Sequence, residues 1–172
     1  MAGYTVAQPV ERIAEQLIRR HHRHLLDVPI RYLFRDKAVV SRGRVVLGKA
    51  RKVSGLAAHL VHLVRKDEPP DQVEFFVIEI ARDGWEGLTE AQRAALVDHE
   101  LCHLGVDIPD DATSDRKLVL RGHDLEEFAA VVERHGMWRP AIEDFRAAAQ
   151  LTLEEAMSIE GGQGNAERAE GR

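Results

Sequence analysis

Apolar positions recur at helical spacing in several parts of the chain. Pro9 suits the first turn of a helix, and Thr89 with Gln92 three residues later has the signature of a capping box. Gly105 and Gly136 follow two apolar periodic stretches and are typical helix stops. The pattern predicts helices over residues 10–26, 89–104, 124–135 and 140–157.

Other stretches are short and rich in β-branched or aromatic residues, which is typical of strands. They predict a small mixed sheet and one brief extended piece, over residues 30–34, 44–47, 73–81 and 117–120. The apolar run from Leu56 to Val64 fits a helix as well as a strand, whereas Gly84–Gly87 is expected to be a loop and Val106–Arg116 irregular. Helices beside a small sheet predict an α+β fold, with the helix over 89–104 directly after the last strand of the sheet.

Length and composition narrow the class of protein. The chain has 172 residues, of which 44% are hydrophobic and 31% charged, so we expect one globular domain over 5–158 and a disordered tail over 159–172. Its net charge of −5 disfavours a nucleic-acid-binding surface. No apolar run approaches the ~18 residues of a membrane span, and Met1–Tyr4 lacks an export signal, so we expect a cytoplasmic protein. We also expect a monomer. The single cysteine, Cys102, excludes an internal disulfide and any zinc cluster that needs two thiolates.

The segment His99-Glu100-Leu101-Cys102-His103 carries the chemistry. Histidines four apart lie on one face of a helix, ~6 Å apart along its axis, so both imidazoles can bind one metal ion. The adjacent glutamate can take a proton from a water molecule on a zinc ion as that water attacks a carbonyl group. We therefore predict a zinc hydrolase in which His99 and His103 are ligands and Glu100 is the general base.

A catalytic zinc ion needs a third protein ligand. The first candidate is His123, which follows Gly122 and precedes the next helix; we expect the missing side chain of this glycine to let the backbone approach the active helix. Glu126 and Glu127 are the alternatives. Whichever carboxylate is not a ligand can orient a ligand imidazole.

At these residues the sequence resembles the putative phage metallopeptidase family, a group of zincin-like proteins. The likeness extends over Pro9–Phe145 and rests on two motifs and the residues around them: His99–His103, His123–Phe128, His135–Trp138, Trp85 and Leu88. The chain is more distantly similar to SprT-like proteases, in which a Gly-His pair supplies the third zinc ligand, as Gly122-His123 would here. This resemblance implies a zincin-like core of the SprT/minigluzincin type, with an N-terminal helix, a small mixed sheet, the HExxH helix and C-terminal helices. It also implies a zinc cofactor, a protein or peptide substrate, and the cytoplasm of a bacterial host.

Two other classes of function compete with the peptidase. One is a non-catalytic module whose zinc ion only braces the fold; the other is a DNA-associated protein that uses the basic residues near Arg51. The histidine tract His21–His24 is interpreted as a solvated helix face, and Cys102 as a small buried packing residue.

Overall fold

The computed structural model describes residues 3–41, 43–64, 74–107, 116–125, 129–137 and 140–152. The chain forms two compact units, Met1–Gly122 and His123–Arg172. The single domain expected over 5–158 stays a prediction, and the tail expected over 159–172 lies outside the described residues.

The helices of the first unit are α1 (Gln8–Arg20), the 3-10 helix η1 (Arg23–Leu25), α2 (Gly55–Val64), α3 (Arg82–Glu86) and α4 (Glu90–Cys102). The prediction of one helix over 10–26 is wrong at its end. The chain turns after Arg20 and continues as η1, which brings Leu25 into the core at 1% exposure. The expected loop at Gly84–Gly87 is wrong as well, since most of it belongs to α3, where Trp85 is buried. The ambiguous run from Leu56 onward is helical.

The strands of the first unit are β1 (Tyr4–Val6), β2 (Ile30–Arg35), β3 (Val39–Ser41), β4 (Arg44–Val46), β5 (Gly48–Val53), β6 (Phe75–Ala81), β7 (Leu104–Asp107) and β8 (Lys117–Leu120). The main sheet has the order β1-β2-β6-β5; β2 is parallel to β6, and the other two pairs are antiparallel. The fold is therefore α+β with a mixed sheet. The prediction that residues 44–47 belong to this sheet is wrong. β4 pairs with β3 instead, while β5 pairs with β6 from Gly48 opposite Ile80 to Val53 opposite Phe75.

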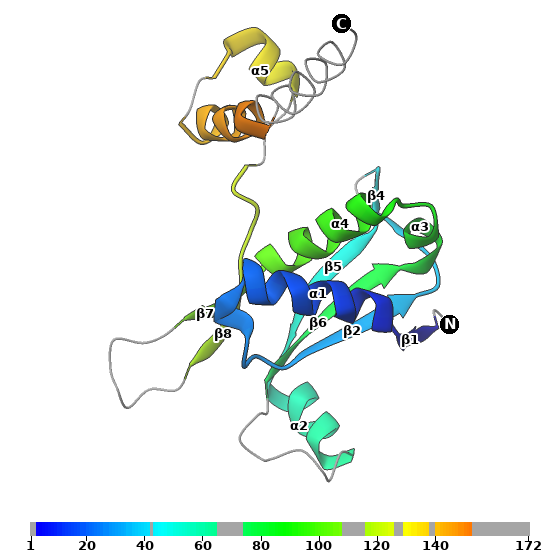
Figure 1. Ribbon diagram of the computed structural model, residues 1–172. Helices are drawn as coiled ribbons and strands as arrows, with labels where there is room; N and C mark the ends of the chain where they lie inside the picture. The colour runs from blue at the N-terminus through cyan, green and yellow to red at the C-terminus, as the bar shows by residue number, and fades with distance from the viewer. Residues whose placement is uncertain are drawn as a thin grey trace, which may run out of the picture. The chain divides into compact units, whose positions relative to one another are not determined.

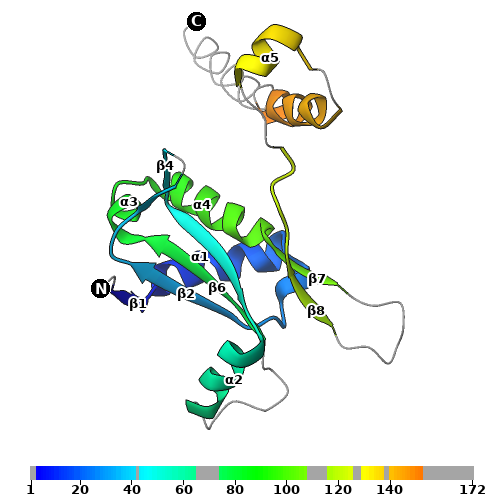
Figure 2. The ribbon, with the colours of Figure 1, turned by 180° about the vertical axis from the view of Figure 1, so that it is seen from behind.

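The hydrophobic core lies on one face of the main sheet, where α1 and α4 pack side by side (Figures 1 and 2). Alternate residues of β6 point to this face, and Phe76, Ile78 and Ile80 are completely buried. From α4, Val97 and Leu101 reach the same core and are also completely buried. Packing on both α1 and the sheet fixes which face of α4 points away from the core.

The β7–β8 hairpin follows α4 directly. The prediction that this helix continues to Leu104 and ends at Gly105 is wrong, because Leu104–Asp107 pairs with Lys117–Leu120 as a strand. Val106 and Asp107, expected to be irregular, belong to the same strand. Gly105 has a steric role: a Cβ atom there would lie 2.7 Å from Arg121 Nε and 2.8 Å from Val119 Cγ2. The hairpin returns the chain to the end of α4.

In the second unit, α5 (Ala129–His135) is followed by a helical segment over residues 140–152. Gly136 ends α5 as predicted: its φ is +67°, and its N–H donates to the Val132 carbonyl at 2.8 Å. The predicted start at Asp124 is wrong, since Asp124 and Leu125 are not helical. Among the described residues of the whole chain, no helix is both long and apolar enough to cross a membrane.

Candidate metal centre

Helix α4 begins with the capping box expected from the sequence. The Thr89 hydroxyl accepts from the Gln92 N–H at 3.3 Å, and the Gln92 side chain accepts from the Thr89 N–H at 3.0 Å. Because Val97 and Leu101 anchor the helix in the core, the directions of the neighbouring side chains on the helix are fixed. His99 is exposed and His103, the C-cap, is half-buried, while Glu100 is buried.

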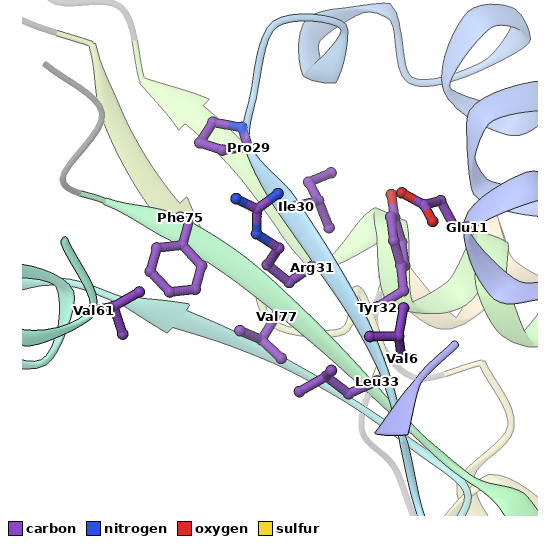
Figure 3. Close-up of a pocket in the computed structure, with 10 residues that line it drawn as sticks. All are labelled: Val6, Glu11, Pro29, Ile30, Arg31, Tyr32, Leu33, Val61, Phe75 and Val77. Atoms are coloured by element: carbon purple, nitrogen blue, oxygen red, sulfur yellow. The ribbon is translucent and has the colours of Figure 1, made fainter. Parts of the chain in front are cut away.

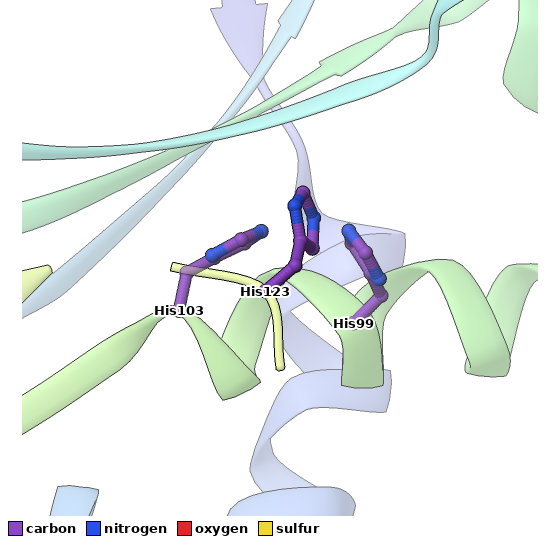
Figure 4. A group of neighbouring side chains, drawn as sticks. All are labelled: His99, His103 and His123. Carbon is purple, nitrogen blue, oxygen red and sulfur yellow. The ribbon is translucent and has the colours of Figure 1, made fainter. Parts of the chain in front are cut away.

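Three histidine side chains converge beside the end of α4 (Figure 4). The rings of His99 and His103 have centroids 5.0 Å apart and are nearly perpendicular, at 84°. One ring nitrogen from each of His99, His103 and His123 lies within 4.8 Å of the others. The structure therefore brings together the histidine pair of the motif and the first candidate for a third ligand.

The β7–β8 hairpin accounts for the position of His123. The Arg121 N–H donates to the His103 carbonyl at 2.8 Å, which holds the chain against the end of α4 two residues before His123. A Cβ atom on Gly122 would meet nothing within 4 Å, so the close approach expected for this glycine is wrong. Strand pairing, not a missing side chain, returns the chain to the helix.

The same hairpin orients the His103 ring. His103 Nδ1 lies 2.8 Å from the Arg121 carbonyl oxygen. A carbonyl oxygen can only accept, so Nδ1 donates, and in the neutral ring the lone pair is on Nε2. A hydrogen bond of this kind sets the tautomer and the direction of metal-ligating histidines in general.

The Glu100 carboxyl group lies against β5 and is only 4% exposed. Burial raises its pKa; the nearby charge of His103, a hydrogen bond from the Ala50 backbone and the charge of Arg35 act in the opposite direction, and burial prevails. The carboxylate occupies the space beside Gly48, where a Cβ atom would lie 2.2 Å from Glu100 Oε1. A buried carboxylate with a raised pKa is a stronger proton acceptor than a solvated one.

Sequence reasoning did not find the residues that surround this carboxylate. Gly48, Ala50 and Arg35 belong to none of the sequence motifs. Their role depends on how β5 lies against α4, for which the sequence holds no local signal. The alternative ligands Glu126 and Glu127 lie outside the described residues.

A separate pocket of about 380 Å³ lies against β2 and β6, with Val61 of α2 and Val6 of β1 also in its lining (Figure 3). Arg31, Leu33 and Val77 line its strand side. None of the predicted site residues lines it. The pocket is therefore distinct from the histidine group.

Two of the three basic residues on β5, Arg51 and Lys52, are paired with acidic ones. The Arg51 guanidinium contacts the Glu79 carboxylate, and Lys52 Nζ lies 2.9 Å from Glu74 Oε2. Cations neutralised in this way contribute less to phosphate binding than unpaired ones. The pairing weakens the case for a nucleic-acid-binding surface around Arg51.

Comparison with known proteins identifies a family. The family model described as "Putative phage metallopeptidase" matches residues 2–149. No curated protein and no solved structure matches the chain significantly. The more distant similarity to SprT-like proteases stays a prediction. The match over residues 2–149 covers most of the 172 residues, and the chain belongs to the putative phage metallopeptidase family.

Proposed function

We propose that the protein is a zinc-dependent peptidase with a zincin-like core, in which His99, His103 and His123 bind the metal ion and Glu100 is the general base. Membership of a metallopeptidase family supports a metal ion and a protein or peptide substrate. The finer assignment of zinc, of the ligands and of the base rests on the geometry of these four side chains.

The donor set suits zinc. Three imidazole nitrogens within 4.8 Å of one another match the three protein ligands of many catalytic zinc sites. The His103 tautomer set by Arg121 directs the Nε2 lone pair away from the backbone. His99 and His123 are exposed, so water and substrate have access to the group. When bound, zinc would supply Lewis-acid polarisation and lower the pKa of a water molecule.

The observation that carries the proposal is the buried Glu100 carboxyl group beside His103. Burial costs free energy when a carboxylate is ionised, and a site that only braces the fold gains nothing from that cost. For hydrolysis the same burial is useful, because it strengthens the base. The Glu100 carboxylate would accept a proton from the water that attacks the peptide carbonyl and then donate it to the leaving amine.

The test compares Glu100→Gln with the wild type, both purified without a histidine tag. Activity is measured on a fluorescently labelled unfolded protein and on a peptide library analysed by mass spectrometry. Glutamine cannot accept the proton, so hydrolysis should fall by at least ~10²-fold. The metal content, measured by elemental mass spectrometry, should be unchanged. Glu90→Gln, an exposed glutamate in the first turn of the same helix, is the matched control.

A second variant separates the metal from the base. His103→Ala should contain one zinc ion per chain fewer than the wild type and lose hydrolysis as well. If Glu100→Gln is as active as the wild type on every cleaved substrate, the mechanism is wrong. If the wild type binds zinc but cleaves nothing, the zinc-braced interaction module replaces the peptidase.

A further inference from the structure

Helix α4 carries a second pair of metal-ligating side chains next to the histidine pair. Asp98 and Cys102 are four residues apart, as are His99 and His103, and a shift of one residue rotates them by about 100° around the helix. Cys102 is exposed and Asp98 half-buried, so the sequence-based expectation of a buried packing cysteine is wrong. Two neighbouring faces of one helix therefore present potential ligands.

His22 reaches this second face from the end of α1. The helix ends at Arg20, and the N–H groups of His21 and His22 donate to carbonyl groups of its last turn, including that of Leu17 at 2.7 and 3.3 Å. Leu25, buried in the core, then fixes the turn that follows. The His22 side chain is consequently only 9% exposed, and the expectation of a solvated histidine tract is wrong for this residue.

His22, Asp98 and Cys102 each have one ligand atom within 4.8 Å of the others. His22 Nε2 lies 2.6 Å from Asp98 Oδ1, so the imidazole and the carboxylate already face each other. The group therefore offers a nitrogen, an oxygen and a sulfur donor, which come from two separate parts of the chain.

We propose that His22, Asp98 and Cys102 bind a second divalent metal ion of the zinc type, separate from the one at the three histidines. Zinc accepts imidazole, carboxylate and thiolate ligands together, and a water molecule would complete a tetrahedral site. On binding, the Cys102 thiol releases its proton to solvent. Two tetrahedral ligands at 2.0–2.1 Å from zinc lie roughly 3.3 Å apart, so the His22–Asp98 contact needs to open by only about 0.7 Å.

The site would act as a clamp between α1 and α4. The ion would join the turn after α1 to the last turn of α4. In α4, Asp98 and Cys102 each precede one histidine of the pair by one residue. An ion there would hold the end of α4 against the core. The proposal does not depend on peptidase activity, since its three residues differ from those of the histidine group.

Cobalt binding tests the proposal, because Cys102 is the only cysteine in the chain. A thiolate-to-cobalt charge-transfer band in the near ultraviolet can therefore arise only from Cys102. Metal-free full-length protein is titrated with Co²⁺. We expect two equivalents to bind, one of them with this band. The band should be absent in Cys102→Ser and retained in His99→Ala, which alters only the neighbouring group.

Variants of the two other ligands complete the design. His22→Gln and Asp98→Asn should lower the affinity for the Co²⁺ ion that gives the band. The loss should exceed the ~10–100-fold typical of residues that only support a ligand. Asp98→Asn keeps the size of the side chain at a half-exposed position, so it tests the site even if His22→Gln fails to fold. Binding of one equivalent without the band overturns the proposal. So does a band that requires His99 but not Asp98, or one that forms only as the chain dimerises.

Discussion

Replacing Gly48 by alanine adds one methyl group at the point where β5 meets the Glu100 carboxylate. The new Cβ atom would lie 2.2 Å from Glu100 Oε1, 2.7 Å from Cδ and 2.9 Å from Cγ. Real Cβ atoms essentially never approach other atoms within 3.0 Å, so one of the two groups must shift. The carboxylate is the end of a flexible side chain and Gly48 is part of a paired strand, so the carboxylate moves.

The expected displacement is roughly 1.2 Å, which brings Oε1 from 2.2 Å to about 3.4 Å, where ordinary van der Waals contact begins. A reacting group misplaced by ~1 Å costs on the order of 10²-fold in rate. The free energy of unfolding should change little. Losing the hydrogen bond from the Ala50 N–H costs about 1 kcal/mol. Alanine offsets this by about 0.4–1 kcal/mol, because it restricts the unfolded chain.

The assay measures kcat/KM, zinc content and urea denaturation for the wild type, Gly48→Ala and Gly87→Ala. Gly87 is the matched control, since a Cβ atom there would meet only a carbonyl oxygen at an ordinary 3.7 Å. Gly48→Ala should lose activity while it keeps its zinc and its stability, and Gly87→Ala should resemble the wild type. Activity of Gly48→Ala within about threefold of the wild type would refute the claim that this glycine positions the base.

Three other expectations concern the ligands, the buried carboxyl group and the core. His123→Ala should lower zinc affinity severely, whereas Glu126→Ala and Glu127→Ala should lower it only ~10–100-fold in chelator competition; the reverse order would make a glutamate the third ligand. In metal-free protein, Glu100→Gln should be more stable than the wild type at pH 7, because the raised pKa means that ionisation disfavours the folded state. This gain in unfolding free energy should shrink as the pH falls through the raised pKa and vanish below the ordinary value of 4.5; a loss of stability at pH 7 would contradict it. Leu101→Ala should cost about 2–5 kcal/mol in urea denaturation, and a cost below 1 kcal/mol would contradict its complete burial.

Local sequence signals were sufficient for the elements that depend on near neighbours. The capping box at Thr89 and Gln92 marked the start of α4, and Gly136 marked the end of α5. The four-residue spacing of His99 and His103 is enough to place both on one helix face. These features involve residues within a turn or two of each other, which is the range over which backbone geometry is repetitive.

The other features depend on tertiary structure, because strand pairing and burial involve residues far apart in the chain. Leu104 fits the apolar pattern of α4, yet it pairs with Leu120 and begins β7. β5, not the more apolar run before it, became an edge strand of the main sheet. Glu100 is buried only because β5 brings Gly48 against it from 52 positions earlier in the chain. Residue periodicity records which face of an element is apolar, but it does not record which distant element covers that face.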